Sequence, residues 1–538
     1  MSPHRGERVL REGPTTDAGT GPLGDNARAR WRAEATAGAR RRGDVASVRR
    51  RRGPSTTARS PRESESRFSR RFLGVFFALY FVLGLGLIAV TPPFQSPDAF
   101  AHFDRAVAIA QGQLVSTTSA GSPGDVFPVG VYQTEVIFSG MAEAPAVRLT
   151  SSEYVYAWHQ SWNSSKYFTI FDTGGNIPFL YAPQVMGVEI GRVVGGHVLV
   201  SYYLAEVMNL LAFVALTGWA MSQFPRRIAV AFAVFLTLPM VSSLAISVNP
   251  DCLLIALSAV FAAAWYRRLS VVAARRPATG APGPARPWNV WATRDERLVY
   301  AALFFMAVEK PPLLLLALLS PLADEAVTLR RYALRVTVVA GSIAVAYELW
   351  ARIASVAHVK THLARGVVPV HQLQLMVTNP VKDVDVVITT LRQYGVLFAK
   401  EFIAGIGWLD TWFPRWFYQG MAVILVFAVA GAVTAPRWGS LRTAGASLVL
   451  ALTAAALLFT FYLVDTPYFN PTVIGFQGRY LLPLVPSLLV TLGWRSPVNA
   501  PLHARGPVVE GYVTLALIAL QVWVFTAYVV TVVHRYWP

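Results

Sequence analysis

The sequence predicts an all-α protein that crosses a membrane about eleven times, with ten crossings as the alternative. Of its 538 residues, 54% are hydrophobic and only 14% are charged, and the mean hydropathy is +0.43. A soluble chain normally carries about 25% charged residues. Several apolar runs approach the roughly 20 residues that a helix needs to span the hydrocarbon core of a bilayer. We therefore expect a polytopic membrane protein.

The first 71 residues differ from the rest in their charge. They contain 18 Arg and 8 acidic residues, with runs such as "VRRRRGP", and few large apolar side chains. Such a segment cannot bury a core, so we expect residues 1–71 to form a disordered, Arg-rich cytoplasmic tail that contacts anionic lipid. Because much of the net charge of +18 belongs to this tail, the charge does not indicate a nucleic-acid partner.

Residues 72–538 are expected to form one transmembrane domain. Its candidate spans are residues 72–91, 197–221, 227–247, 251–267, 299–322, 335–356, 419–434, 443–464, 479–495 and 511–533. In one of them the sequence "VEKPP" places Glu309, Lys310 and two prolines inside the apolar run, and a proline pair breaks a helix. Two short helices that meet there give eleven crossings and keep the basic loops on the cytoplasmic side. An unbroken span gives ten.

The eleven-crossing topology places the N-terminus in the cytoplasm and the C-terminus outside. Three segments then form outer loops, residues 91–196, 357–418 and 465–478, and we expect the long ones to be helical. The membrane itself is the first expected partner of the chain.

The first outer loop begins with an unusual group of ionisable residues. Ser96 is a suitable N-cap and Pro97 a suitable first helical residue, so a helix is expected from Asp98 to about Gln111. Asp98, His102 and Arg105 then share one helix face. The functional interpretation is a general base, Asp98, tuned by His102. The structural alternative is that Asp98 complements the helix dipole and pairs with His102.

Other charged residues are expected at the same level of the membrane. Asp251 begins a span, Glu309 and Lys310 mark the broken one, and Gln477 and Arg479 open another. Ionisable groups at membrane depth usually face a cavity or one another. Lys310 and Arg479 together are suited to bind a phosphate, and anchoring at the interface is the alternative for each of them alone.

Metal and nucleotide cofactors are not expected. Cys252 is the single cysteine, which excludes an internal disulfide and any cysteine-based metal site. The usual nucleotide-binding and zinc-binding motifs are missing from the sequence.

Four segments carry a resemblance to a known family. At "PPFQSPDAFAHFDRAVAIAQGQL", "IPFLYAPQVMGVEIGRVVG", "GWLDTWFP" and "GFQGRYLLPLVP" the chain resembles a family of bacterial multi-pass membrane proteins of unassigned function. That family is similar to the GT-C glycosyltransferases, which use polyprenyl-phosphate donors on the non-cytoplasmic side. The resemblance implies a GT-C-like fold, an acidic catalytic residue at Asp98 and a donor-phosphate role for Lys310 and Arg479.

Two positions depart from the family pattern. Ala99 stands where a second acidic residue is common, so a divalent metal is not supported, and Glu206 stands where a basic residue is usual.

The resemblance implies an inverting glycosyltransferase in the bacterial plasma membrane. Its partners would be a polyprenyl-phosphate-linked sugar and a cell-envelope glycan or glycolipid as the acceptor. From their predicted positions, rather than from the resemblance, Arg105, Asp251 and Gln477 are also expected to bind substrate or phosphate. The alternatives are a non-catalytic transporter or flippase, or an assembly scaffold, for lipid-linked saccharides.

Overall fold

Apolar helices dominate the part of the chain that the computed structural model describes. That part comprises residues 67–119, 122–275, 293–323, 329–356, 366–433, 441–494 and 507–538. The mostly helical, multi-span architecture expected from the sequence is confirmed. Residues 1–66 lie outside the described residues, so the disordered tail stays a prediction.

Seven helices of the described residues are long and apolar enough to cross a membrane. They are α2 (Arg70–Val90), α7 (Val198–Gln223), α10 (Asp251–Arg275), α12 (Leu329–Val356), α15 (Arg415–Ala432), α16 (Leu441–Val464) and α18 (Pro507–Tyr536). Each coincides with a predicted span, because the hydropathy of a run of about 20 residues is a local property of the sequence. Seven is fewer than the predicted eleven, and the difference lies in spans that are divided into shorter helices.

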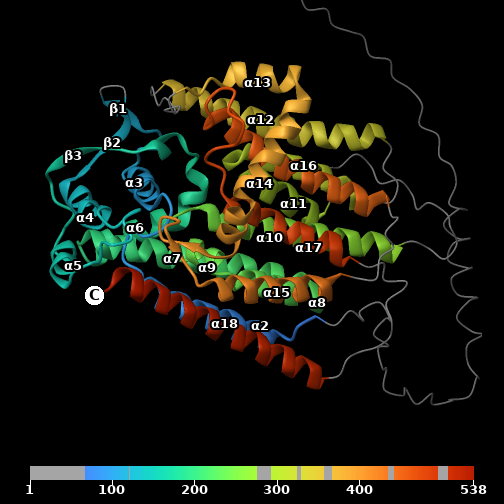
Figure 1. Ribbon diagram of the computed structural model, residues 1–538, viewed down its shortest axis with the longest axis horizontal. Helices are drawn as coiled ribbons and strands as arrows, with labels where there is room; N and C mark the ends of the chain where they lie inside the picture. Colours follow the sequence, from blue (N-terminus) through green and yellow to red (C-terminus); the bar gives the residue numbers. More distant parts are fainter. Residues whose placement is uncertain are drawn as a thin grey trace, which may run out of the picture. The chain divides into compact units, whose positions relative to one another are not determined.

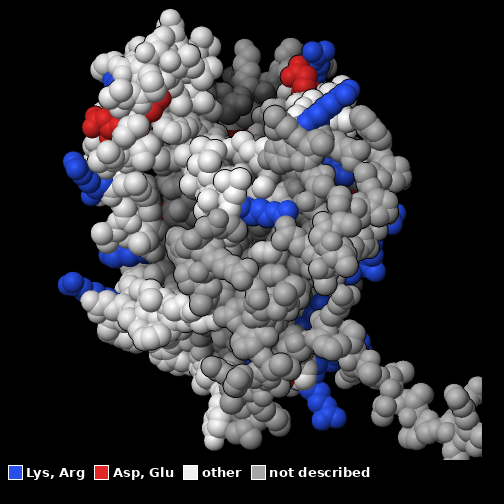
Figure 2. Space-filling view, turned by 90° about the vertical axis from the view of Figure 1, so that its right-hand side faces the viewer, with Lys and Arg blue, Asp and Glu red and all other residues white. Residues whose placement is uncertain are grey.

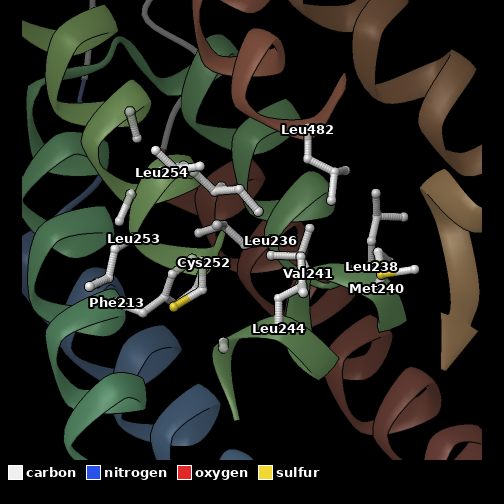
Figure 3. Packing of buried hydrophobic residues seen from close by; sticks show 14 of the residues in the cluster. Phe213, Leu236, Leu238, Met240, Val241, Leu244, Cys252, Leu253, Leu254 and Leu482 are labelled. Carbon is white, nitrogen blue, oxygen red and sulfur yellow. The ribbon is translucent and has the colours of Figure 1, made fainter. Parts of the chain in front are cut away.

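One divided span is strongly bent. α8 (Arg226–Leu236) and α9 (Pro239–Ala245) together pass as an eighth span, with an angle of 73° between them. Pro239 begins α9, and a proline ring cannot continue the hydrogen-bond ladder of the helix before it. Figure 3 shows side chains on both sides of the bend, among them Leu236 and Val241, in one apolar core with Leu253 of α10.

The predicted break after Glu309 is confirmed. α11 (Arg294–Glu309) ends there, and the 3-10 helix η4 (Pro311–Ala323) begins two residues later. Arg268 of α10 donates to Glu296 near the start of α11 and also to Ser320 near the end of η4. Because the two far ends meet the same arginine, η4 returns along α11, which is the reversal that eleven crossings require.

The last divided span consists of the 3-10 helix η5 (Gly478–Leu484) followed directly by α17 (Val485–Gly493). Pro483 lies inside η5 and Pro486 in the first turn of α17, which explains the change of helix type.

The segment after α2 contains helices, as expected, and in addition three short strands that were not predicted. Its elements are α3 (Ala99–Ala110), β1 (Thr117–Ser119), β2 (Ser122–Pro128), α4 (Val129–Ser139), α5 (Ser151–Trp158), β3 (Lys166–Ile170), η2 (Asp172–Gly175), η3 (Pro178–Tyr181) and α6 (Ala182–Val194). The three strands form one antiparallel sheet in the order β1-β2-β3. Figure 1 shows these elements together at one end of the helices.

The second predicted outer loop contains a long helix. Its described part comprises α13 (Pro369–Thr378), α14 (Pro380–Ala404) and a pair of two-residue strands, β4 (Gly405–Ile406) and β5 (Thr411–Trp412). Charged residues near the start of α14, such as Lys382, Asp383 and Asp385, distinguish it from an apolar span.

The C-terminal helix lies beside the first one and runs in the same direction (Figure 1). The backbone N–H of Ser69 donates to Glu510 where the two helices begin, and the Trp537 indole donates to the Val90 carbonyl where they end, at 2.8 Å. At that end the buried Arg535 pairs with Asp410 at 3.0 Å. The last residues of the C-terminal helix therefore fix the position of the end of α2, from which the next segment begins.

Candidate functional site

Asp98 occupies the junction between the first span and α3. The helix begins at Ala99 with Asp98 as its N-cap, so the cap is not Ser96 as predicted. Asp98 has φ of 59° and lies in the left-handed region, outside the helix, and therefore does not continue the helical face of His102 and Arg105. This conformation is uncommon for a residue with a side chain and indicates a local constraint on the backbone.

The carboxylate of Asp98 pairs with Arg479, which is 381 residues away in the chain. Arg479 Nη2 donates to Asp98 Oδ2 at 2.8 Å; the arginine side chain is 1% exposed and the aspartate side chain is 52% exposed. Arg479 Nε donates to Gln477 Oε1 at 2.6 Å, while its buried Nη1 has no hydrogen-bond partner. Asp98 therefore presents an accessible carboxylate beside a buried guanidinium that retains a free donor.

A second ion pair joins the predicted residues of two other segments. Lys310 Nζ lies 2.7 Å from Asp251 Oδ1, and both side chains are largely buried. Asp251 begins α10 as predicted, and the Asn249 side chain accepts a hydrogen bond from its backbone N–H. Asn249 Nδ2 also donates to the carbonyl of Pro97, at 3.2 Å. This asparagine thus connects the residue before Asp98 to the start of α10.

Tyr480 brings the two cations together. The Lys310 nitrogen lies 4.5 Å from the centre of its ring, and the Arg479 guanidinium carbon lies 5.2 Å from it. The ring stacks on Phe461 at 4.7 Å. We call Asp98, Asp251, Lys310 and Arg479 the paired-charge site. The role of Tyr480 was not predicted from the sequence, although an aromatic residue beside an arginine is a common cation–π arrangement.

His102 lies near this site without pairing with Asp98. Its Nδ1 is 2.7 Å from the Tyr181 hydroxyl, which accepts a hydrogen bond from Asn176 Nδ2. The imidazole is thus held by a buried hydroxyl that Asn176 fixes in turn. Burial lowers the pKa of His102, although the carboxylates of Asp98 and Asp251 oppose the shift. The ring is thus held neutral by its surroundings.

Arg105 donates its hydrogen bonds to backbone carbonyls and none to the four residues of the paired-charge site. Its Nη2 donates to the carbonyls of Asn176 and Leu114, at 2.6 and 2.8 Å, and the residue is fully buried. Its donors hold two loop segments against α3, and the guanidinium also interacts electrostatically with Glu309, the residue before Lys310.

A buried pair of carboxyl groups stabilises the contact between α3 and α4 and was not predicted. Asp104 and Glu135 are 2% and 7% exposed. Burial raises the pKa of Glu135 to about 8, and burial together with the Glu135 carboxyl raises that of Asp104. Two adjacent carboxyls in such surroundings share a proton. The signal in the sequence was two acids on helices with otherwise apolar faces.

The shared proton leads to a testable prediction of how the stability of the protein depends on pH. Because the pKa of Glu135 is higher in the folded state than the 4.5 of a free side chain, its contribution to stability is complete below pH 4.5 and is lost as the pH rises to about 8. We expect Glu135→Gln to flatten the decrease of stability over this range by up to about 1.4 kcal/mol per pH unit. Thermal unfolding of the purified protein between pH 5 and 8 measures this, with Glu189→Gln on exposed α6 as the control. Parallel curves for wild type and Glu135→Gln would contradict the shared proton.

No group of three or more His, Cys, Asp or Glu residues is placed to hold a metal ion within the described residues. Cys252 is buried and free.

Comparison with known proteins places the chain in a family. A search of the curated proteins finds no match. Among solved structures, the chain is similar to the crystal structure of ArnT from Cupriavidus metallidurans bound to undecaprenyl phosphate, with 15% identity, a TM-score of 0.36, and 87% of this chain and 76% of that chain covered. Residues 81–488 match the family described as predicted membrane protein (DUF2142). Because the match covers most of the chain, the protein belongs to this family of predicted membrane proteins.

Proposed function

We propose that the protein is an inverting glycosyltransferase that moves a sugar from a polyprenyl-phosphate donor to a hydroxyl of a cell-envelope glycan or glycolipid. One observation carries the proposal. The accessible carboxylate of Asp98 lies 2.8 Å from buried Arg479, whose Nη1 has no hydrogen-bond partner. A base and a phosphate-binding donor are thus adjacent, and Lys310 supplies a second cation beside Tyr480.

The proposed reaction uses these groups in two roles. Asp98 takes the proton of the acceptor hydroxyl as its oxygen forms a bond to the anomeric carbon of the sugar. The bond between that carbon and the donor phosphate oxygen breaks, and the electron pair leaves with the phosphate. Arg479 and Lys310 stabilise the charge on the departing phosphate, for which a fork of guanidinium donors and an ammonium group are suited. His102, whose ring interacts with the charges of Asp98 and Arg479, tunes the base.

We place the paired-charge site at the outer face of a bacterial plasma membrane, with the N-terminus in the cytoplasm and the C-terminus outside. Figure 2 looks onto the right-hand end of Figure 1, where α2 and α18 begin, and Lys and Arg side chains are prominent around it. Basic residues favour the cytoplasmic side. Their position supports an outer location for the opposite end, which carries the sheet and α3.

The experiment that tests the proposal is sugar transfer in membranes from labelled polyprenyl-phosphate sugars, with undecaprenyl phosphate as the first lipid tried. We expect Asp98→Asn to lower transfer by about 10²–10⁴-fold, because the amide can still accept from Arg479 but cannot take a proton. Glu189→Gln, on the exposed face of α6, is the matched control and should transfer normally. Undiminished transfer by Asp98→Asn at equal expression would remove Asp98 from the role of base.

A transporter or flippase for lipid-linked saccharides is the second candidate. The observation that favours it is the presence of two interrupted segments, the 73° bend between α8 and α9 and the reversal between α11 and η4. Broken helices near a binding site are common in transporters. Movement of labelled polyprenyl phosphate across vesicles that is unchanged in Asp98→Asn, without any sugar transfer, would favour this candidate. An assembly scaffold would instead lose its function on deletion of residues 1–65.

A further inference from the structure

A small pocket lies directly below the chain segment that leads to Asp98. Its small size suits a single ion or water molecule rather than a lipid head group. Polar side chains of three segments line it: Gln95 and Ser96 from the junction after α2, Glu206 from α7, and Ser243 from α9. Neither the paired-charge site nor the proposed transfer reaction uses this pocket.

Glu206 is the charged group of the pocket. It lies about two turns from the start of α7, a candidate membrane span, and is 8% exposed. The Tyr202 hydroxyl lies next to it, and among the described residues no basic side chain forms an ion pair with it. A carboxylate at membrane depth needs a positive charge or a proton, because burying it alone is costly.

Two other oxygen atoms in the pocket lack hydrogen-bond partners. Both amide protons of Gln95 are directed to the carbonyls of Pro93 and Phe138, which turns Gln95 Oε1 the other way, and this buried oxygen has no hydrogen-bond partner. The buried hydroxyl of Ser96 likewise has none. Buried acceptors are normally satisfied, so these atoms point to a ligand.

We propose that this pocket binds a small monovalent cation, such as Na⁺, through the side-chain oxygens of Gln95, Ser96 and Glu206. A proton on Glu206 would neutralise the carboxyl, but its single O–H can donate to only one acceptor, whereas a cation can be coordinated by all three side-chain oxygens at once. Hard cations prefer such oxygen ligands. In transporters, Na⁺ sites lie at interrupted helices near the middle of the membrane, and here the pocket adjoins bent α9.

The cation would also order the approach to Asp98. The backbone N–H of Phe94 donates to the Tyr202 hydroxyl at 2.8 Å, and Phe94 has φ of 64°, in the left-handed region. Gln95 and Ser96 follow directly. A cation held between Glu206 and these two residues therefore ties the junction to α7, and it does so whether or not the proposed transfer reaction is correct.

The test is thermal unfolding of the purified full-length protein at pH 7 in sodium, potassium or choline chloride at equal ionic strength. We expect sodium to raise the midpoint of the wild type by about 2 °C or more over choline, increasing with concentration. Glu206→Gln should lose the shift. Ser96→Ala should raise about tenfold the sodium concentration that gives half of the shift. Because the Ser96 hydroxyl makes no hydrogen bond in the structure, this variant should still fold. Glu189→Gln is the control that should keep the full shift.

Three results would overturn the cation site. Equal midpoints in sodium, potassium and choline would show that no cation binds. A sodium shift that persists unchanged in both Glu206→Gln and Ser96→Ala would place the cation elsewhere. Stabilisation of the wild type by lower pH alone, abolished in Glu206→Gln and independent of sodium, would identify a proton as the occupant. Potassium acting like sodium, with loss in both variants, would support the site without size selectivity.

Discussion

Replacement of Arg479 by lysine is expected to lower sugar transfer by about 10²–10³-fold in a protein that still folds, the loss typical of one donor to a developing negative charge. Nη2 of the guanidinium donates to Asp98 and Nε donates to Gln477, while Nη1 has no hydrogen-bond partner. Nη1 is the donor that we propose for a phosphate oxygen. An ammonium group keeps the charge, so Asp98 is still neutralised, but it cannot reproduce the planar fork. The measurement is kcat/KM for the donor lipid.

The control for this prediction is Arg192→Lys. Arg192 is an exposed arginine on α6 that pairs with Glu189 at 2.7 Å, so the same exchange there should leave transfer unchanged. Wild-type kcat/KM in Arg479→Lys would show that the fork does not bind the phosphate, and the proposed mechanism would then rest on Lys310 alone.

Gly478→Ala is expected to destabilise the protein by about 1–3 kcal/mol and to reduce transfer as well. A Cβ at this position would overlap the backbone carbonyl of Phe398 on α14, and a backbone atom cannot rotate away as a flexible side chain can. The N–H of Gly478 also donates to Glu401 Oε2 at 2.7 Å. Any shift of η5 away from α14 would carry Arg479 with it.

Gly395→Ala is the matched comparison on the same helix pair. Gly395 lies inside α14, and a Cβ there meets no atom within 4 Å. Alanine favours a helix over glycine by about 1 kcal/mol, so this variant should be neutral or slightly more stable. Unfolding midpoints and transfer rates of the two variants decide the matter, and equal behaviour would refute the close approach of η5 to α14.

Local signals in the sequence were sufficient to locate the membrane-spanning helices and several of their ends. The apolar runs, the prolines after Lys310, and the start of α10 at Asp251 were all predicted, because each depends on the chemistry of a few neighbouring residues. The strands of the first outer segment were missed. Its short strands form their hydrogen bonds only across the sheet, with β2 paired to β3 from residues about 40 positions later.

The partners of the charged residues required the tertiary structure. Helical spacing suggested that Arg105 and Asp98 share one helix face. In the structure, Arg105 donates to backbone carbonyls, and Asp98 pairs with Arg479. Nothing near Asp98 in the sequence encodes that choice, because it depends on which distant helix packs beside α3. The hydrogen bond between Tyr181 and His102 and the contact of Lys310 with the Tyr480 ring likewise depend on the tertiary structure.

The sequence by itself therefore determined that the chain is a helical membrane protein, where most spans begin and end, and that charged residues recur where chain segments leave the membrane. Hydropathy and helix-breaking residues act over one or two turns, so they can be read without the fold. The tertiary structure decided which charges pair, which remain accessible and which are buried as structural contacts. These outcomes depend on distances between segments hundreds of residues apart, and electrostatic interactions follow those distances rather than the order of the chain.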